Sequence, residues 1–141
     1  ETLSLRMERH LQNAKSVLEF LSNHEAVAWV RHPDLPDHPN HAVAQRQLPK
    51  GTTSMIVFGV KGGFDAGRKL INSVKLASHV SNVGDAKTLL VHPASTTHMQ
   101  LGPEQRKLAG VPDDLIRLSV GIEHVDDIID DLRASLRASQ R

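Results

Sequence analysis

The 141-residue sequence contains no cysteine and no tyrosine, and aromatic residues make up only 3% of it. The lack of cysteine excludes disulfides, thiolate catalysis, iron–sulfur clusters and cysteine-type zinc sites, and it is consistent with a reducing cytoplasm. The few aromatic side chains leave almost no surface on which single-stranded bases could stack. These absences argue against a disulfide-stabilised secreted scaffold and against a nucleic-acid-binding module.

The chain is not dominated by one sign of charge, and it has no long apolar run. Lys and Arg total 17 and Asp and Glu total 16, so no field of one sign attracts nucleic acid or an anionic membrane. The longest apolar run covers residues 55–58 and continues past Gly59 to Val60, far short of the roughly 20 residues that span a bilayer. No signal peptide opens the sequence. We therefore expect a cytoplasmic protein without a membrane partner and, at this length, a single hydrophobic core.

A long apolar stripe occupies the beginning of the chain. Apolar residues recur at steps of three or four from Leu3 to Leu21, which predicts an amphipathic helix of about six turns. Neither Thr2 nor Ser4 is followed three residues later by Glu or Gln, so a capping box is missing there. We expect residues 1–22 to be a linking helix whose natural start lies upstream, and residues 23–141 to form one compact domain.

The rest of the chain mixes short strands and helices without the regular βαβ order of a doubly wound fold. This pattern predicts an α+β fold with a small, mostly antiparallel sheet covered by helices. Alternation, β-branched residues and turn signals predict strands at 26–31, 54–60, 79–82, 88–91 and 115–120. Helical spacing and capping signals predict helices at 41–47, 64–76, 103–109 and 125–136.

Three local patterns could carry chemistry, but each has a simpler explanation. Residues 32–41 hold three histidines and two aspartates among three prolines that scatter their side chains, which favours a solvated loop over a metal site. Lys61-Gly62-Gly63 before a helix resembles a phosphate cradle, yet it fits no nucleotide motif and two glycines suffice for a turn. Ser95 and His98 lack the surroundings of a hydrolase nucleophile. We predict no metal and no catalytic residue from these patterns.

Arg117 is the more informative residue, because it stands between Ile116 and Leu118 in an apolar strand. A guanidinium held partly inside a core is costly unless an anion pairs with it. Its planar fork suits a carboxylate bound through two parallel hydrogen bonds. The anion could belong to the protein or to a ligand, and position alone favours a structural salt bridge.

Four segments of the sequence resemble pyridoxal-phosphate enzymes of the Cys/Met metabolism family. Together they extend the likeness from Glu1 to about Leu136. They are ETLSLRMERH, VKGGFDAGRKLINSVKLASHVSNVGDAK, HVSNVGDAKTLLVHPASTTHMQL and LIRLSVGIEHVDDIIDDL. Residues 82–84 (NVG) with residues 95–98 (STTH) are most similar to the O-acetylhomoserine sulfhydrylase branch, since the γ-synthases and lyases usually carry serine at the position of Asn82.

The resemblance implies the C-terminal domain of a fold-type I enzyme, joined by the opening helix to a larger upstream domain. That domain would hold pyridoxal phosphate on a lysine whose motif has no counterpart here, so this chain would bind no cofactor and be inactive alone. The intact enzyme would make homocysteine or methionine from O-acetylhomoserine and sulfide or a thiol. It would be a homotetramer in which the upstream domain is the partner of this one.

The resemblance also assigns substrate-binding residues. Arg117 matches the arginine that binds the α-carboxylate of the amino-acid substrate, which reverses the preference for a structural salt bridge. Asn82 matches a polar group beside that carboxylate, and Thr97 matches a threonine near the same site. Two alternatives stay open: a cystathionine γ-synthase or γ-lyase relative, and a free-standing module that binds a small carboxylate.

Overall fold

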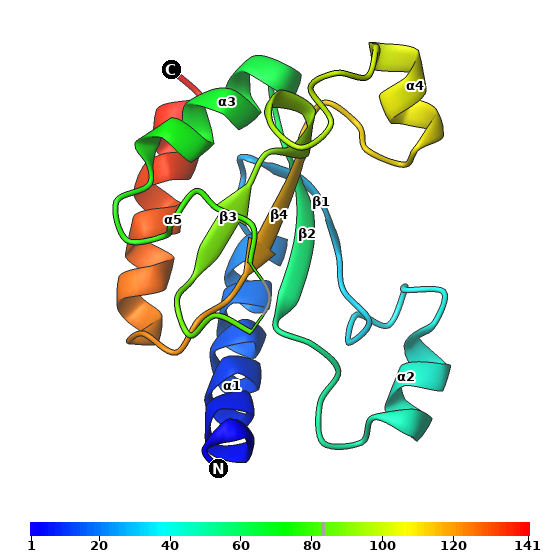
Figure 1. The fold of residues 1–141 in the computed structure, drawn as a ribbon, viewed down its shortest axis with the longest axis vertical. Helices are drawn as coiled ribbons and strands as arrows, with labels where there is room; N and C mark the ends of the chain where they lie inside the picture. The colour runs from blue at the N-terminus through cyan, green and yellow to red at the C-terminus, as the bar shows by residue number, and fades with distance from the viewer. Residues whose placement is uncertain (83) are drawn as a thin grey trace.

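The computed structural model describes residues 1–82 and 84–141, and it consists of a four-stranded sheet with three helices packed against one face (Figure 1). This arrangement confirms the α+β class. The helices are α1 (Leu3–Ser22), α2 (His41–Gln47), α3 (Gly63–Ser73), α4 (Pro103–Leu108) and α5 (Val125–Ser139). The strands are β1 (Val27–Arg31), β2 (Met55–Val60), β3 (Leu89–Val91) and β4 (Leu115–Ser119), and a short 3-10 helix covers Pro93–Ser95.

The strands pair in the order β1-β2-β4-β3, and all three pairings are antiparallel. The two central strands, β2 and β4, bury alternate side chains because successive residues of a strand point to opposite faces. Phe58 lies opposite Ile116, and both are fully buried beneath α1, α3 and α5. Val57 lies opposite Arg117, so these two side chains project from the face that the helices leave uncovered.

The segment between α3 and β3 differs from the prediction at both of its ends. The helix predicted over residues 64–76 ends at Ser73, and Val74 is extended. Asp131 of α5 accepts hydrogen bonds from the backbone N–H groups of residues 75–77, at N···O distances of 2.8 to 3.0 Å. A carboxylate that binds three successive N–H groups stabilises a turn in place of further helix.

The strand predicted over residues 79–82 is wrong. Ser78 alone forms a parallel bridge, to Leu89, and the following residues take an irregular path over the sheet. Their β-branched and polar composition suggested a strand, but pairing with the open edge of β3 stops at Ser78, and Ser81 instead contacts Arg117. The segment therefore serves as a loop that crosses the uncovered face.

α1 is buried in its second half and exposed at its beginning. Leu3 and Leu5 are 61% and 68% exposed, whereas Leu21 is fully buried. Between them, His10 Nδ1 lies 2.7 Å from the carbonyl oxygen of Val120, the residue after β4. No helix within the described residues is both long enough and apolar enough to cross a membrane.

Candidate functional site

Arg117 lies in the middle of β4, half-buried on the uncovered face of the sheet. Val57 of β2 and Val91 of β3 are its neighbours across the strands. The prediction that the guanidinium lies partly inside the core is wrong. Ile116 and Leu118 point into the core, and strand alternation places the side chain between them on the opposite face.

The guanidinium of Arg117 has a hydroxyl as its protein partner. Its Nη2 donates to Ser81 Oγ at 2.5 Å. In the part of the chain that the structure describes, no carboxylate forms an ion pair with it. The arginines that do form ion pairs are Arg68, Arg106 and Arg133. The salt bridge that position alone favoured is therefore not found, and the remaining N–H donors of Arg117 are available to a carboxylate ligand.

Asn82 follows Ser81 directly, so the loop that contacts Arg117 brings both predicted residues to the same region. The exposed Asn82 side chain donates to Asp85 Oδ2 at 3.3 Å. A backbone hydrogen bond from Lys87, with this one from Asn82, lowers the pKa of Asp85. Val83 of the same motif lies outside the described residues. Sequence reasoning did not single out Ser81, and its position next to Asn82 was the only signal for it.

Thr97 lies in the turn after the 3-10 helix, where its side chain is exposed. Its Oγ1 and the Nδ1 of His98 are 2.9 Å apart. The described contacts join Ser81 to Arg117 but do not join Thr97 to either of them. Ser95 Oγ pairs with His92 Nδ1 at 2.8 Å, so Ser95 and His98 do not form a hydrolase pair.

Two carboxylates fix the ends of the loop that carries Ser81. Asp131 binds its beginning, as described above. At its end, Glu123 accepts hydrogen bonds from the Thr88 backbone N–H at 2.7 Å and from the Thr88 hydroxyl at 2.9 Å. A Cβ at Gly121 would lie 2.4 Å from the backbone nitrogen of Thr88, so a glycine is required there. This anchoring holds Ser81 over Arg117.

His92, just after β3, is buried between α3 and the residues before β4. Its Nε2 donates to the Asp113 carbonyl oxygen at 2.7 Å, and its Nδ1 lies 2.8 Å from Ser95 Oγ. Gly67 of α3 packs against the ring, and a Cβ there would lie 2.5 Å from Nε2. Burial lowers the pKa of His92 from its usual 6.5.

This neutral, buried histidine predicts a loss of stability in acid. The unfolded state binds more protons than the folded state once the pH falls below about 6.5, so the free energy of unfolding decreases there and continues to fall through the lowered pKa. We expect His92→Asn to reduce the pH dependence between about pH 8 and about pH 5, as measured by urea unfolding. His24 also has a lowered pKa, so it adds to the pH dependence of both proteins. The test therefore compares the slope of the unfolding free energy against pH in wild type and in His92→Asn. Equal slopes would contradict this assignment.

The histidines of residues 32–41 hold their loop together. His32 is 2% exposed, and its Nε2 contacts the Thr53 carbonyl at 3.0 Å. His41 Nδ1 lies 2.8 Å from the Pro33 carbonyl. Over residues 1–82 and 84–141, no group of three or more His, Asp or Glu side chains could hold a metal ion.

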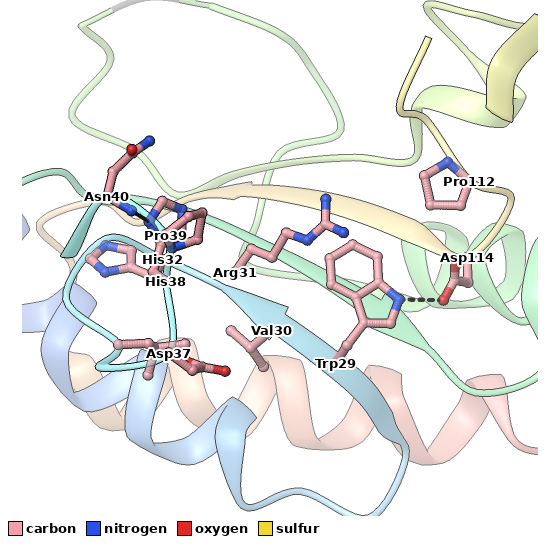
Figure 2. A pocket seen from close by; sticks show the side chains of 11 residues that line it. Trp29, Val30, Arg31, His32, Asp37, His38, Pro39, Asn40, Pro112 and Asp114 are labelled. Carbon is pink, nitrogen blue, oxygen red and sulfur yellow. Dashed lines mark hydrogen bonds between the residues drawn. The ribbon is translucent and has the colours of Figure 1, made fainter. Parts of the chain in front are cut away.

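A cavity of about 720 Å³ lies between β1, this loop and the residues before β4 (Figure 2). Trp29 forms one wall and donates from Nε1 to Asp114 Oδ2 at 2.7 Å. The guanidinium of Arg31 lies beside the indole ring, with Cζ 5.2 Å from its centroid. The sequence did not point to this cavity, because its walls come from segments far apart in the chain.

Residues 1–137 match the model of a family described as Cys/Met metabolism PLP-dependent enzymes. The chain belongs to this family. It is 52% identical over 139 residues to the homocysteine synthase of Schizosaccharomyces pombe, covering 99% of this chain and 32% of that protein. It is 48% identical over 136 residues to the O-acetyl-L-homoserine sulfhydrylase 1 of Thermus thermophilus, covering 96% of this chain and 32% of that protein.

An L-methionine gamma-lyase of Fusobacterium nucleatum subsp. polymorphum is also 48% identical over 136 residues, with 96% of this chain and 34% of the lyase covered. The chain therefore spans about a third of the length of these curated relatives. The predicted membership of the Cys/Met metabolism family is confirmed.

The residues of this chain do not by themselves fit the cofactor of the Cys/Met metabolism family. Every lysine in the sequence is exposed, and none lines the 720 Å³ cavity. Gly62 and Gly63 have φ of +99° and +65°, so the phosphate-cradle candidate is a left-handed turn at the start of α3. We derive no cofactor contact from these residues.

Proposed function

We propose that this chain is the substrate-anchoring part of a pyridoxal-phosphate-dependent transferase that makes homocysteine or methionine from O-acetylhomoserine and sulfide or a thiol. The observation that carries the proposal is Arg117, a half-buried guanidinium on the uncovered sheet face whose described protein partner is the Ser81 hydroxyl. The names of two similar proteins, a homocysteine synthase and an O-acetyl-L-homoserine sulfhydrylase, support the same chemistry.

In this proposal Arg117 binds the α-carboxylate of the amino-acid substrate through its planar fork. Ser81 holds the guanidinium in one orientation, and Asn82 and Thr97 donate hydrogen bonds near the same carboxylate. The contribution of this chain is to fix the orientation of the substrate, which removes rotational freedom before reaction. The chemistry of the cofactor belongs to the upstream domain, so this chain alone is inactive.

The proposed partner is that upstream domain, reached through α1. Leu3, Leu5 and Met7 are exposed on the first two turns of this helix, and large apolar side chains grouped in this way favour a covering surface. From the resemblance to the family we further propose a homotetramer in the cytoplasm. A monodisperse dimer of the full-length protein would contradict the tetramer.

A γ-lyase is the second candidate, because an L-methionine gamma-lyase is as similar to this chain as the sulfhydrylase. The lyase breaks the side chain of its substrate, whereas the transferase adds a sulfur nucleophile to it. Both would use Arg117 in the same way. The structure of the anchor therefore supports both, and the substrate separates them.

A substrate panel on the full-length protein tests this assignment. We expect turnover of O-acetylhomoserine with sulfide to exceed turnover of O-succinylhomoserine, cystathionine and methionine. Each reaction is followed by its own product: homocysteine for the transferase, and a 2-oxo acid with ammonia for the lyase. Strong turnover of cystathionine or methionine, with none of O-acetylhomoserine, would replace the transferase with a synthase or lyase.

A further inference from the structure

A second arginine projects from the same face of the sheet as Arg117. Arg31 of β1 lies opposite Val57 of β2, and Val57 lies opposite Arg117 of β4. Residues directly opposite each other point to the same face, and neighbouring strands are about 4.8 Å apart, so the two arginines start roughly 10 Å from one another. Arg31 therefore presents a separate positive group toward the 720 Å³ cavity.

The guanidinium of Arg31 rests on a rigid support. Its Cζ lies 5.2 Å from the centroid of the Trp29 ring, within cation–π distance. The indole is fixed by its hydrogen bond to Asp114 and lies against bare backbone at Gly59, where a Cβ would be only 2.1 Å from Nε1. A planar group that stacks on a fixed ring loses less freedom when it binds a ligand.

The positive charge of Arg31 has no ion-pair partner in the described parts of the chain. Asp114 is the acid nearest the indole wall, and its Oδ2 already accepts the Trp29 N–H. Asp37 lines the cavity from the loop and appears on the other side of β1 in Figure 2. Neither carboxylate lies within ion-pair distance of Arg31, whose N–H donors thus stay open to the cavity.

The remaining walls favour a particular kind of anion. Trp29, Pro39 and Pro112 supply apolar surface, and His38 and Asn40 supply polar groups at the rim. Val30 points to the other side of β1 and packs against the core. A volume of about 720 Å³ lies within the range typical of small-molecule sites. A flat oxyanion suits the fork of Arg31, and an aliphatic body suits the apolar walls beside it.

We propose that Arg31 and Trp29 form a binding site for a carboxylate carried on an aliphatic body. The carboxylate accepts two parallel hydrogen bonds from the guanidinium at the edge of the indole, and the body occupies the cavity along β1. This site is independent of Arg117 and of the proposed transferase activity. It adds to the protein a second place that recognises a carboxylate.

Trp29 is the only tryptophan of the chain, so it reports directly on this site. We expect isocaproate, a branched aliphatic carboxylate, to cause a saturable change in Trp29 fluorescence and in the shift of its indole N–H resonance. Isocaproamide, which has the same shape without charge, and acetate, which lacks the body, serve as ligand controls. Both should bind at least about tenfold more weakly, since a charge-assisted pair or a buried side chain each contribute that much.

Arg31→Gln should weaken isocaproate binding at least about tenfold, with an unchanged circular dichroism spectrum. Arg46→Gln removes the same charge from the exposed surface of α2 and should leave binding unchanged. In a longer polypeptide that includes this chain, the indole N–H resonance that disappears in Trp29→Phe is the one from Trp29. The isocaproate titration then follows that resonance. The proposal is overturned if wild-type protein shows no saturable change, if Arg31→Gln binds as well as wild type, or if isocaproamide binds equally well.

Discussion

Replacing Arg117 with glutamine in the full-length protein is expected to raise KM for the amino-acid substrate by about 100-fold. A charge-assisted pair contributes about 3 kcal/mol, and each 1.4 kcal/mol is a factor of ten. Because the α-carboxylate keeps its charge throughout the reaction, most of this loss is expected in binding, with a smaller change in kcat. Steady-state kinetics with O-acetylhomoserine and sulfide measure both constants.

Two further variants define what Arg117 contributes. Arg117→Lys keeps the charge but removes the planar fork, so its KM should lie between those of wild type and the glutamine variant. Arg46→Gln removes one positive charge elsewhere on the surface and should behave as wild type. An unchanged KM for Arg117→Gln would show that the substrate carboxylate is bound by another residue.

Replacing Phe58 with alanine is expected to lower the free energy of unfolding by about 3–5 kcal/mol. Phe58 is fully buried at the centre of β2, beneath the three helices. Removing the ring loses buried apolar surface and leaves a cavity that close-packed neighbours fill only in part. The loss is large beside a total stability of about 5–15 kcal/mol. Urea denaturation followed by circular dichroism measures it.

Leu108→Ala provides the matched control, since this large apolar side chain is 89% exposed. We expect its effect to stay within about 0.5 kcal/mol. A similar loss in both variants would mean that Phe58 does not occupy the centre of a single core. A loss below about 1 kcal/mol at Phe58 would mean that the ring is not enclosed as described.

The sequence predicted the elements whose pattern is local. The spacing of Leu70 and Ile71, and of Ile128 and Leu132, marks the buried sides of α3 and α5, and both pairs are buried in the structure. The helix over 41–47 and the strand at the centre of 115–120 are also found where the pattern places them. Each of these signals depends on residues within a few turns or alternations of each other.

The errors concern contacts between distant segments. The helix after Gly63 ends early because Asp131, more than fifty residues away, binds the backbone that follows it. Arg117 was recognised as unusual, but its face of the sheet depends on which side the helices cover. Ser81 and Arg31 have ordinary surroundings in the sequence. Ser81 acquires its role through Arg117, 36 residues later. Arg31 contacts Trp29 within β1, but the cavity beside them is completed by Pro112 and Asp114 from a distant segment.

The strand order has a consequence for how the chain folds during synthesis. β4 is the last strand to be made, yet it lies between β2 and β3, and Phe58 pairs with a residue 58 positions later. Until β4 leaves the ribosome, β2 and β3 each lack a neighbour along one edge. Exposed strand edges pair readily with other chains. The nascent protein therefore exposes unpaired strand edges until residues 115–119 are added and β4 inserts between β2 and β3.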